Sequence, residues 1–221
     1  MNNTNLNKTN LNKTSPNAYI IRREVPADYR ETENVVREAF WNVYHPGCVE
    51  HYVLHTFRSR QNFVPELDLV MEKDGKIIGQ IMYVRAAIKA DDSRNIPVLT
   101  MGPIGILPAY KRQGYGKALL DYSLKAAGEM GVGALCIEGN LDFYGKSGFV
   151  VASSMGIHYY AEPREAVVPY FLCRELQPGY LQGVTGTYHT PQEYFVDAQE
   201  AEIFDAKFPK KEKLILPGQL A

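Results

Sequence analysis

The chain contains few cysteines, almost no net charge and no long apolar run. Its three cysteines, Cys48, Cys136 and Cys173, are odd in number and show no paired spacing, which excludes a disulfide scaffold and favours buried, reduced thiols. Twenty-four Lys and Arg oppose 25 Asp and Glu, giving a formal net charge of −1 at pH 7, so a general polyanion binder is not indicated. The longest apolar stretch, residues 98–107, is too short to cross a bilayer.

The remaining composition is that of an ordinary globular protein. Hydrophobic residues make up 45% and charged residues 22% of the 221 positions, enough to bury a substantial core. The N-terminal residues lack the apolar core of a signal peptide. We therefore expect a cytoplasmic protein without nucleic-acid or membrane partners, and the sequence is compatible with a homodimer.

The sequence divides into three regions. Residues 1–18 contain a polar tandem repeat, TNLNK-TNLNK-T, which cannot bury enough surface to offset its ordering entropy, so we expect a disordered tail. Residues 19–176 show regular strand and helix patterns and form the predicted domain. After Gln177 the periodicity is lost, and 177–221 are predicted to be a C-terminal extension. Its KFPKKEK run, which includes Lys210 and Lys211, is typical of a solvated chain end.

Strands and helices alternate along the predicted domain, but the early strands pair as hairpins. The expected elements are a strand at 19–23, helices at 28–47 and 49–60, strands at 67–72, 77–88 and 96–107, a helix at 114–130, a strand at 132–137, a short helix at 141–147, and strands at 148–160 and 167–176. Asp28 is the candidate cap of the first helix. Asp74-Gly75 is a hairpin tip, and Gly102-Pro103 indicates either a bulge or a place where something approaches the backbone closely. The order predicts an α/β fold with a mixed, mostly antiparallel central sheet and helices on both faces.

A glycine loop precedes the third helix. In KRQGYGKALL, Gly114 and Gly116 follow Lys111 and Arg112 and come just before a helical pattern. Free backbone N–H groups and the helix dipole favour an anion at such a place, typically a phosphate. A Walker A loop is excluded because Ala118 stands where Ser or Thr is needed, and a dinucleotide fingerprint is excluded because Leu119 replaces the third small residue.

The segment around this loop resembles the GNAT superfamily of acetyl-CoA-dependent acetyltransferases. GPIGILP, KRQGYG and NLDFYGKSGF occur in the family's order, and together they are most similar to the bacterial YhbS-like subgroup. KRQGYG is similar to the family's R/Q-x-x-G-x-G/A pyrophosphate motif, with Lys111 at the first position. The resemblance implies six to seven strands, with the fourth and fifth splayed apart.

The resemblance also implies site residues. The backbone at Ile104 and Ile106 would face the pantetheine arm, and an N–H near Ile106 would stabilise the oxyanion. Asn140 would lie near the pantetheine, and Tyr144 would face the sulfur. The residues so assigned to acetyl-CoA are Ile104, Ile106, Lys111, Arg112, Gln113, Gly114, Tyr115, Gly116, Lys117 and Asn140.

Transfer to an amine requires a base and an acid. An alkyl ammonium of pKa about 10.4 must lose a proton before it attacks, and the leaving thiolate needs one. Tyr144 fits the acid because a phenol of pKa about 10 stays protonated at pH 7. Residues 96–107 contain no carboxylate, so Glu138 at the end of the next strand is the first candidate for the base, with His158 or a water chain as alternatives. No covalent intermediate is required of Cys136.

Another cluster of polar residues, HPGCVEHYVLH, places Cys48, His51 and His55 on one helix face near His45. Its spacing matches no zinc signature, and the Glu of H-E-x-x-H is missing, so we predict no metal. By the resemblance, these residues would line the acceptor pocket.

Three functional hypotheses remain. The first is an acetyltransferase that moves the acetyl group of acetyl-CoA directly to an amine of a small molecule or peptide. The second is an acyl-CoA-binding regulatory module without turnover, and the third is the transfer of another short acyl group. The sequence leaves the acceptor unidentified.

Overall fold

The computed structural model describes residues 18–220, so the predicted disordered tail lies almost wholly outside the described residues. Within this range one sheet has nine strands: β1 Ile20–Arg23, β2 Leu69–Lys73, β3 Lys76–Ala90, β4 Asn95–Ile106, β5 Ala134–Glu138, β6 Val150–Val151, β7 Ile157–Tyr159, β8 Phe171–Glu175 and β9 Gly186–Tyr188. The helices are α1 Tyr29–Phe40, α2 Glu50–Phe57, α3 Tyr115–Glu129, α4 Leu141–Tyr144 and α5 Ala198–Asp205.

The sheet runs in the order β1-β2-β3-β4-β5-β8-β6, and β9 pairs with both β3 and β7. All of its pairings are antiparallel except β4–β5 and β7–β9. This confirms the predicted mixed, mostly antiparallel α/β fold. The strands exceed the expected six to seven because β7 and β9 are short additions beside β3.

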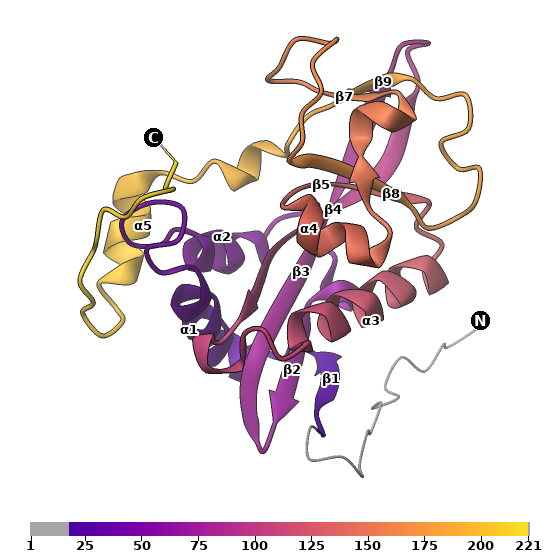
Figure 1. Ribbon diagram of the computed structural model, residues 1–221. Coiled ribbons are helices and arrows are strands. Elements are labelled where there is room, and N and C mark those ends of the chain that lie inside the picture. The colour runs from indigo at the N-terminus through magenta and orange to yellow at the C-terminus, as the bar shows by residue number, and fades with distance from the viewer. Residues whose placement is uncertain (1–17, 221) are drawn as a thin grey trace.

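Helices cover both faces of the sheet (Figure 1). Successive side chains of β3 point to opposite faces. Tyr83 packs in a core with α3, and its hydroxyl lies 2.7 Å from Ser123 Oγ. Met82 and Val84 pack on the other face against residues of α1 and α2. We refer to these as the α3 face and the α1/α2 face.

The β2–β3 hairpin turns where the sequence predicts it. Asp74 and Gly75 have φ values of +52° and +74°, as a two-residue turn with both central residues left-handed requires. Asp-Gly tolerates this conformation because Gly has no Cβ and Asp is among the residues that enter the left-handed region most readily. The tip therefore sets the register of the hairpin.

A bulge interrupts β4 at Gly102-Pro103, as the sequence predicts. Ile81 of β3 pairs with Ile104, but Tyr83 pairs with Met101, so β4 holds one residue more than β3 between these pairs. Before the bulge the odd-numbered residues of β4 face α3. After the bulge the even-numbered residues Ile104 and Ile106 face α3. The bulge thus changes which side chains the end of β4 presents to each face.

Beyond the bulge, β4 and β5 part. Their parallel register joins Leu99 to Leu135 and no other pair within residues 18–220. β5 keeps an unbroken antiparallel ladder with β8 on its other edge, and β4 keeps β3. The fourth and fifth strands are therefore splayed, as the resemblance implies.

The region after Gly148 differs from the prediction of one long strand over 148–160. The chain forms β6, a 3₁₀ turn at Ala152–Met155, and then β7. Gly156 has a φ of +76°, which turns the chain, and Ser154 Oγ donates to Val151 O at 2.7 Å. An apolar run does not reveal such a turn, because its residues are buried in either conformation.

Other element ends also shift. The strand expected at 167–176 is shorter, because β8 begins at Phe171. The first helix ends at Phe40 rather than at 45–47. Asp28 stands before α1 as expected, but its carboxylate accepts Val25 N at 2.9 Å and pairs with Arg22 instead of capping the first helical turn.

The region after Gln177 folds back onto the domain. β9 joins the sheet, and α5 packs against α2 through Phe204 and His51, whose rings are 5.3 Å apart. The Arg37 guanidinium, almost fully buried, pairs with Asp205 of α5, with 3.1 Å between Nη2 and Oδ2. In the KFPKKEK run, Lys211 pairs with Glu38. The aperiodic sequence of this region gives no sign of this packing.

All three cysteines are buried and free, as predicted. Cys136 and Cys173 lie side by side on β5 and β8 with their sulfurs 3.9 Å apart. Burial raises the pKa of the Cys48 and Cys136 thiols. Of the helices in residues 18–220, none combines the length and apolar character that a bilayer crossing needs.

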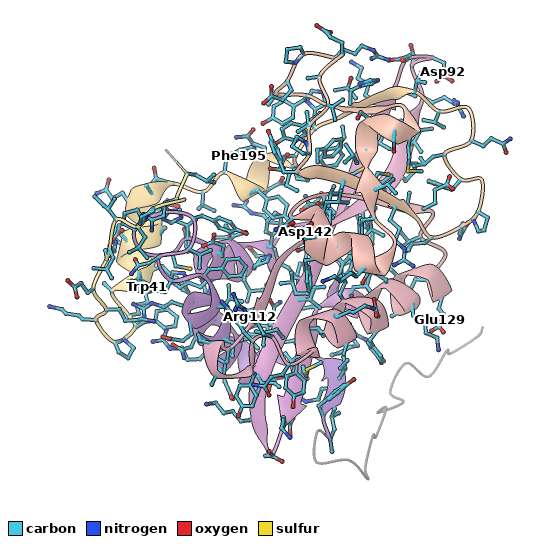
Figure 2. All side chains as sticks on the ribbon, viewed as in Figure 1. Trp41, Asp92, Arg112, Glu129, Asp142 and Phe195 are labelled. Carbon is cyan, nitrogen blue, oxygen red and sulfur yellow. The ribbon has the colours of Figure 1, made fainter. Side chains whose placement is uncertain are left out.

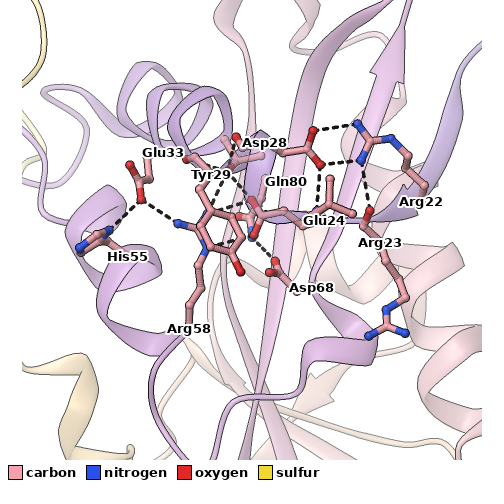
Figure 3. Close-up of polar contacts among 12 residues, drawn as sticks. Arg22, Arg23, Glu24, Asp28, Tyr29, Glu33, His55, Arg58, Asp68 and Gln80 are labelled. Carbon is pink, nitrogen blue, oxygen red and sulfur yellow. Dashed lines mark hydrogen bonds and ion pairs between the residues drawn. The ribbon is translucent and has the colours of Figure 1, made fainter.

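A buried ionic network holds α1 and α2 to the edge of the sheet (Figure 3). Arg58 donates to Glu24 at 2.8 and 3.0 Å and to Glu33 at 2.7 Å. Asp68 lies beneath them and accepts a hydrogen bond from Gln80 Nε2 at 3.1 Å. Burial and the neighbouring Glu24 raise the pKa of Asp68 to about 9, so Asp68 is neutral at pH 7.

The Asp68 proton makes stability depend on pH. Its folded pKa exceeds the unfolded value of 3.8, so its contribution is fully present below about pH 4 and is lost as pH rises toward 9. Asp68→Asn keeps the shape and stays neutral. We expect this variant to be more stable than wild type by at least about 2 kcal/mol at pH 8.5 and to differ little at pH 4, as measured by urea unfolding. A variant less stable than wild type at pH 8.5 would contradict this assignment.

Candidate active site

The glycine loop places several backbone N–H groups at the start of α3. Gly114 precedes the helix with a φ of +88°, and Arg112 has a φ of +61°. The N–H groups of Gly116 and Lys117 lie in the first helical turn, where no intrahelical acceptor exists. Those of Arg112, Gln113 and Gly114 donate to no backbone oxygen within residues 18–220. Together with the positive end of the helix dipole, they form an anion-binding loop.

Most polar side chains of this loop are already engaged. Lys111 Nζ donates to Ala39 O near the end of α1 at 2.7 Å, so it points away from the loop's N–H groups, and burial lowers its pKa. Gln113 Nε2 donates to Ala109 O at 2.9 Å, and Lys117 pairs with Asp121. Arg112, labelled in Figure 2, is exposed and is the one loop cation in the described residues without an ion-pair or hydrogen-bond partner.

The two glycines leave room for a ligand. A Cβ on Gly114 would meet no atom within 4 Å, so the space beside the loop is open. A Cβ on Gly116 would lie 3.5 Å from Ile106 and 3.6 Å from Phe143, an ordinary contact distance. Packing within the protein therefore does not require glycine at 116. Open space beside unpaired N–H groups fits the diphosphate of a nucleotide cofactor.

The end of β4 offers further N–H groups. Leu107 N donates to Ile78 O of β3 at 2.9 Å. Because N–H directions alternate along an antiparallel strand, those of Ile106 and Ile104 point away from β3, toward the side from which β5 has parted. The two residues that the resemblance singled out thus face the gap between the strands.

Asn140 and Tyr144 flank that gap from β5. Asn140 caps α4, with its side chain accepting Asp142 N at 2.8 Å. The Tyr144 ring packs on Gly139 and on Phe143 and Phe149, with ring centroids 4.8 and 5.7 Å away. Burial raises the pKa of Tyr144, so its hydroxyl stays protonated at neutral pH.

Glu138 and Tyr144 lie on opposite faces of the sheet. Leu99 and Leu135 pair on the α3 face, so Cys136 and Glu138 point to the α1/α2 face. Tyr144 packs into the α3-face core. Glu138 is exposed and accepts a hydrogen bond from Thr190 Oγ1 at 2.6 Å. The parted strands thus have a carboxylate on one face and a phenol on the other.

His158, the alternative base, lies elsewhere. Its neighbours on β7, Ile157 and Tyr159, point into the core beneath β9, so His158 faces the other way. Its Nδ1 is buried without a hydrogen-bond partner among the described residues. His158 lies close enough to Asp91, just beyond β3, to contribute to the lowered pKa of that carboxyl.

The histidines of HPGCVEHYVLH do not converge. His51 is fully buried against Phe204 and Phe208, with Nε2 3.1 Å from Asp205 Oδ1, and burial lowers its pKa to about 4. His55 pairs with Glu33 at 2.8 Å, and Cys48 donates to Glu50. Among residues 18–220, no three His, Cys, Asp or Glu side chains cluster as metal ligands. His55 instead lines a groove of about 670 Å³ between α2 and α5.

Sequence reasoning missed the residues that cover the α1/α2 face of the gap. Tyr188, Thr190 and Tyr194 come from the region called an extension, and Tyr194 Oη donates to Gly102 O at 3.0 Å, at the bulge. Phe195, labelled in Figure 2, follows on the link to α5. The sequence after Gln177 has no regular pattern that could have identified them.

Comparison with known proteins agrees with this geometry. Residues 66–151 match the family model of the acetyltransferase (GNAT) domain. The uncharacterized N-acetyltransferase YhbS of Escherichia coli (strain K12) is 23% identical over 76% of this chain and 93% of its own length. The uncharacterized N-acetyltransferase YjhQ of the same organism is 29% identical over 38% of this chain, a match that spans 46% of YjhQ.

Two solved structures share the fold. YhbS from E. coli in complex with CoA superposes with a TM-score of 0.68 at 22% identity, over 80% of this chain and 91% of that one. A GNAT family acetyltransferase from Brucella melitensis in complex with acetyl-CoA superposes with a TM-score of 0.62 at 23% identity, over 80% of this chain and 97% of that one. This chain therefore has the fold of these two proteins. The segment that matches the GNAT domain model, residues 66–151, contains the glycine loop and Tyr144.

The contact between Tyr144 and Gly139 can be tested directly. A Cβ on Gly139 would lie 2.2 Å from the Tyr144 ring, whereas one on Gly145 would lie 3.4 Å from Leu141. We therefore expect Gly139→Ala to displace the ring and cost about 1–3 kcal/mol of stability, while Gly145→Ala is neutral. Urea unfolding measures both; equal stabilities would show that the ring does not rest on Gly139.

Proposed function

We propose that this protein transfers the acetyl group of acetyl-CoA directly to an amine of a small molecule or peptide, with both substrates bound at once. The observation that carries the proposal is the gap between β4 and β5, with unpaired N–H groups on one side and acid–base groups on both faces. YhbS and the Brucella enzyme, which share this fold, were solved with CoA and acetyl-CoA.

The α3 face is the proposed cofactor side. The N–H groups from Arg112 to Lys117 would hold the pyrophosphate, with the Arg112 guanidinium adding charge. The N–H groups of Ile104 and Ile106 would bind the pantetheine arm, and Asn140 would border it. Lys111 would contribute through its bond to Ala39 O, by fixing the loop against α1, rather than by direct contact.

Tyr144 and Glu138 are the proposed acid and base. Tyr144, on the cofactor side, has a raised pKa and would give its proton to the leaving sulfur. Glu138, on the opposite face, would take a proton from the incoming ammonium, directly or through water. Their placement lets each group act on its own substrate.

We further propose that residues 19–176 make up the transferase domain and that residues 177–221 extend it. The Arg37–Asp205 pair ties this extension to α1 at one end, and the β9 ladder ties it to β3 at the other.

The anion-binding loop is tested by Gly114→Glu, with Gly131→Glu as a matched control. Both glycines have nearly the same φ, +88° and +86°, and stand at opposite ends of α3, so both variants pay a similar strain of about 1–2 kcal/mol. We expect Gly114→Glu alone to weaken CoA binding by more than about tenfold in calorimetric titration. Equal CoA affinities in the two variants would contradict a site at this loop.

The acid is tested by Tyr144→Phe. Burial, and not a hydrogen bond within residues 18–220, dominates the surroundings of the Tyr144 hydroxyl, so its loss should leave stability and CoA affinity nearly unchanged. We expect kcat to fall about 100-fold in thiol-release assays with a panel of primary amines. An unchanged kcat would exclude Tyr144 as the acid. CoA binding by wild type without any turnover across the panel would favour an acyl-CoA-binding module instead.

A further inference from the structure

One short segment closes the α1/α2 face of the gap. Tyr194 packs its ring 4.6 Å from that of Phe57 in α2 and donates its hydroxyl to Gly102 O at the bulge. Four residues earlier, Thr190 Oγ1 donates to Glu138 at the end of β5 and lies 3.2 Å from Tyr159 Oη. Residues 188–194 therefore touch both strands where they part.

Tyr188, at the start of this segment, is fully buried. Its ring stacks on Phe171 at 5.2 Å, and its backbone pairs with Ile88 of β3 and Tyr159 of β7. Its hydroxyl makes no hydrogen bond of ordinary geometry among residues 18–220, although the Thr100 hydroxyl is close enough to lower its pKa. An unpaired buried hydroxyl costs free energy, which calls for a reason other than packing.

The surroundings of this hydroxyl point to the gap. Thr100, one residue before Met101 on β4, lies on the α1/α2 face, opposite Val84. The pKa values of Tyr188 and Tyr194 are both raised, first by burial and further by the nearby charge of Glu138, and the Thr100 hydroxyl opposes both shifts. Tyr188 and Tyr194 thus pack in the cores of the α1/α2 face, the face that also carries Thr100 and Glu138.

We propose that Tyr188 and Tyr194 form the acceptor half of the transferase site, where their hydroxyls and the Glu138 carboxylate bind the primary ammonium group of the acceptor. An ammonium has three donors and no acceptor, so it needs oxygen atoms arranged around it. Two phenol oxygens and a carboxylate meet that need, and the negative charge selects a cation over a neutral group. The proposal rests on the proposed acetyl transfer.

The proton balance follows from this arrangement. The ammonium gives one proton to Glu138, and its nitrogen lone pair then attacks the thioester carbonyl. The C–N bond forms and the C–S bond breaks, and the sulfur takes the Tyr144 proton. The second proton lost by the nitrogen restores Tyr144, and Glu138 releases its proton to water. The products are the N-acetyl amine, the free thiol and one proton.

Two CoA thioethers test the proposal without knowledge of the natural acceptor. S-(2-aminoethyl)-CoA places an ammonium next to the sulfur, and S-propyl-CoA is its neutral counterpart of the same length. We expect wild type to bind the ammonium probe about tenfold more tightly than the propyl probe in calorimetry at pH 7. Absence of any preference while CoA itself binds would overturn the acceptor assignment alone. If CoA also fails to bind, both the acceptor assignment and the proposed function are overturned.

Variants of the three proposed residues test which side chains cause the preference for the ammonium probe over the propyl probe. We expect Glu138→Gln to abolish it and Tyr188→Phe and Tyr194→Phe to reduce it at least about threefold, with CoA affinity unchanged in all three. Tyr160→Phe, whose exposed ring stacks on His189, is the matched control and should keep it. Tyr188→Phe should also unfold at no lower urea concentration than wild type, because it removes an unpaired buried hydroxyl. A preference that survives in both phenylalanine variants would overturn the proposal.

Discussion

The rest of the site depends on the separation of β4 and β5, which stop hydrogen-bonding to each other after a single pair. The two strands pair at Leu99 and Leu135 and then separate, while each keeps an intact ladder with its other neighbour. Backbone N–H and C=O groups without a strand partner are free to hydrogen-bond water or a ligand. The separation therefore creates both the space and the polar groups for an extended ligand between the strands.

Three local features maintain this separation. The bulge at Gly102-Pro103 redirects β4 and turns Ile104 and Ile106 toward α3. Gly105 lets α1 approach the strand closely, since a Cβ there would lie 3.2 Å from Ala39 Cβ. Tyr144, resting on Gly139, fills the β5 side with an aromatic ring. Each feature includes a glycine, whose lack of a side chain allows the backbone conformation or the close contact.

The two faces of the gap are held by different interactions. The α3 face is an apolar core that includes Ile106, Leu119 and Phe149. The α1/α2 face depends more on buried charge, with Arg58 between Glu24 and Glu33 and Arg37 bound to Asp205. Removing one partner of such a pair leaves a buried charge uncompensated, which is far more costly than the pair is stabilising. The packing of α1, α2 and α5 on this face is thus sensitive to the loss of a single charge.

The sequence predicts the domain up to α4 well because its signals there are local. Asp74-Gly75, Gly102-Pro103 and the glycines before α3 each impose a backbone conformation that few other residues allow. The segment that supplies Tyr188, Thr190 and Tyr194 carries no such signal, since its position depends on long-range pairing with β3 and on the Arg37–Asp205 contact. The position of the Lys111 side chain is likewise not evident from local sequence, because it donates a hydrogen bond to a carbonyl of α1 that is distant in sequence. The site residues assigned from the sequence stay predictions until a ligand is bound.

The central claim is that the gap between β4 and β5 and the loop before α3 form one ligand site. Amide hydrogen exchange with and without CoA tests it most directly, because the N–H groups of Ile104, Ile106 and the loop from Arg112 to Lys117 would all be covered by one bound molecule. We expect CoA to slow exchange in both segments together, while peptides from β2 and the β2–β3 turn are unaffected. Slowing confined to other parts of the chain, or none at saturating CoA, would contradict it.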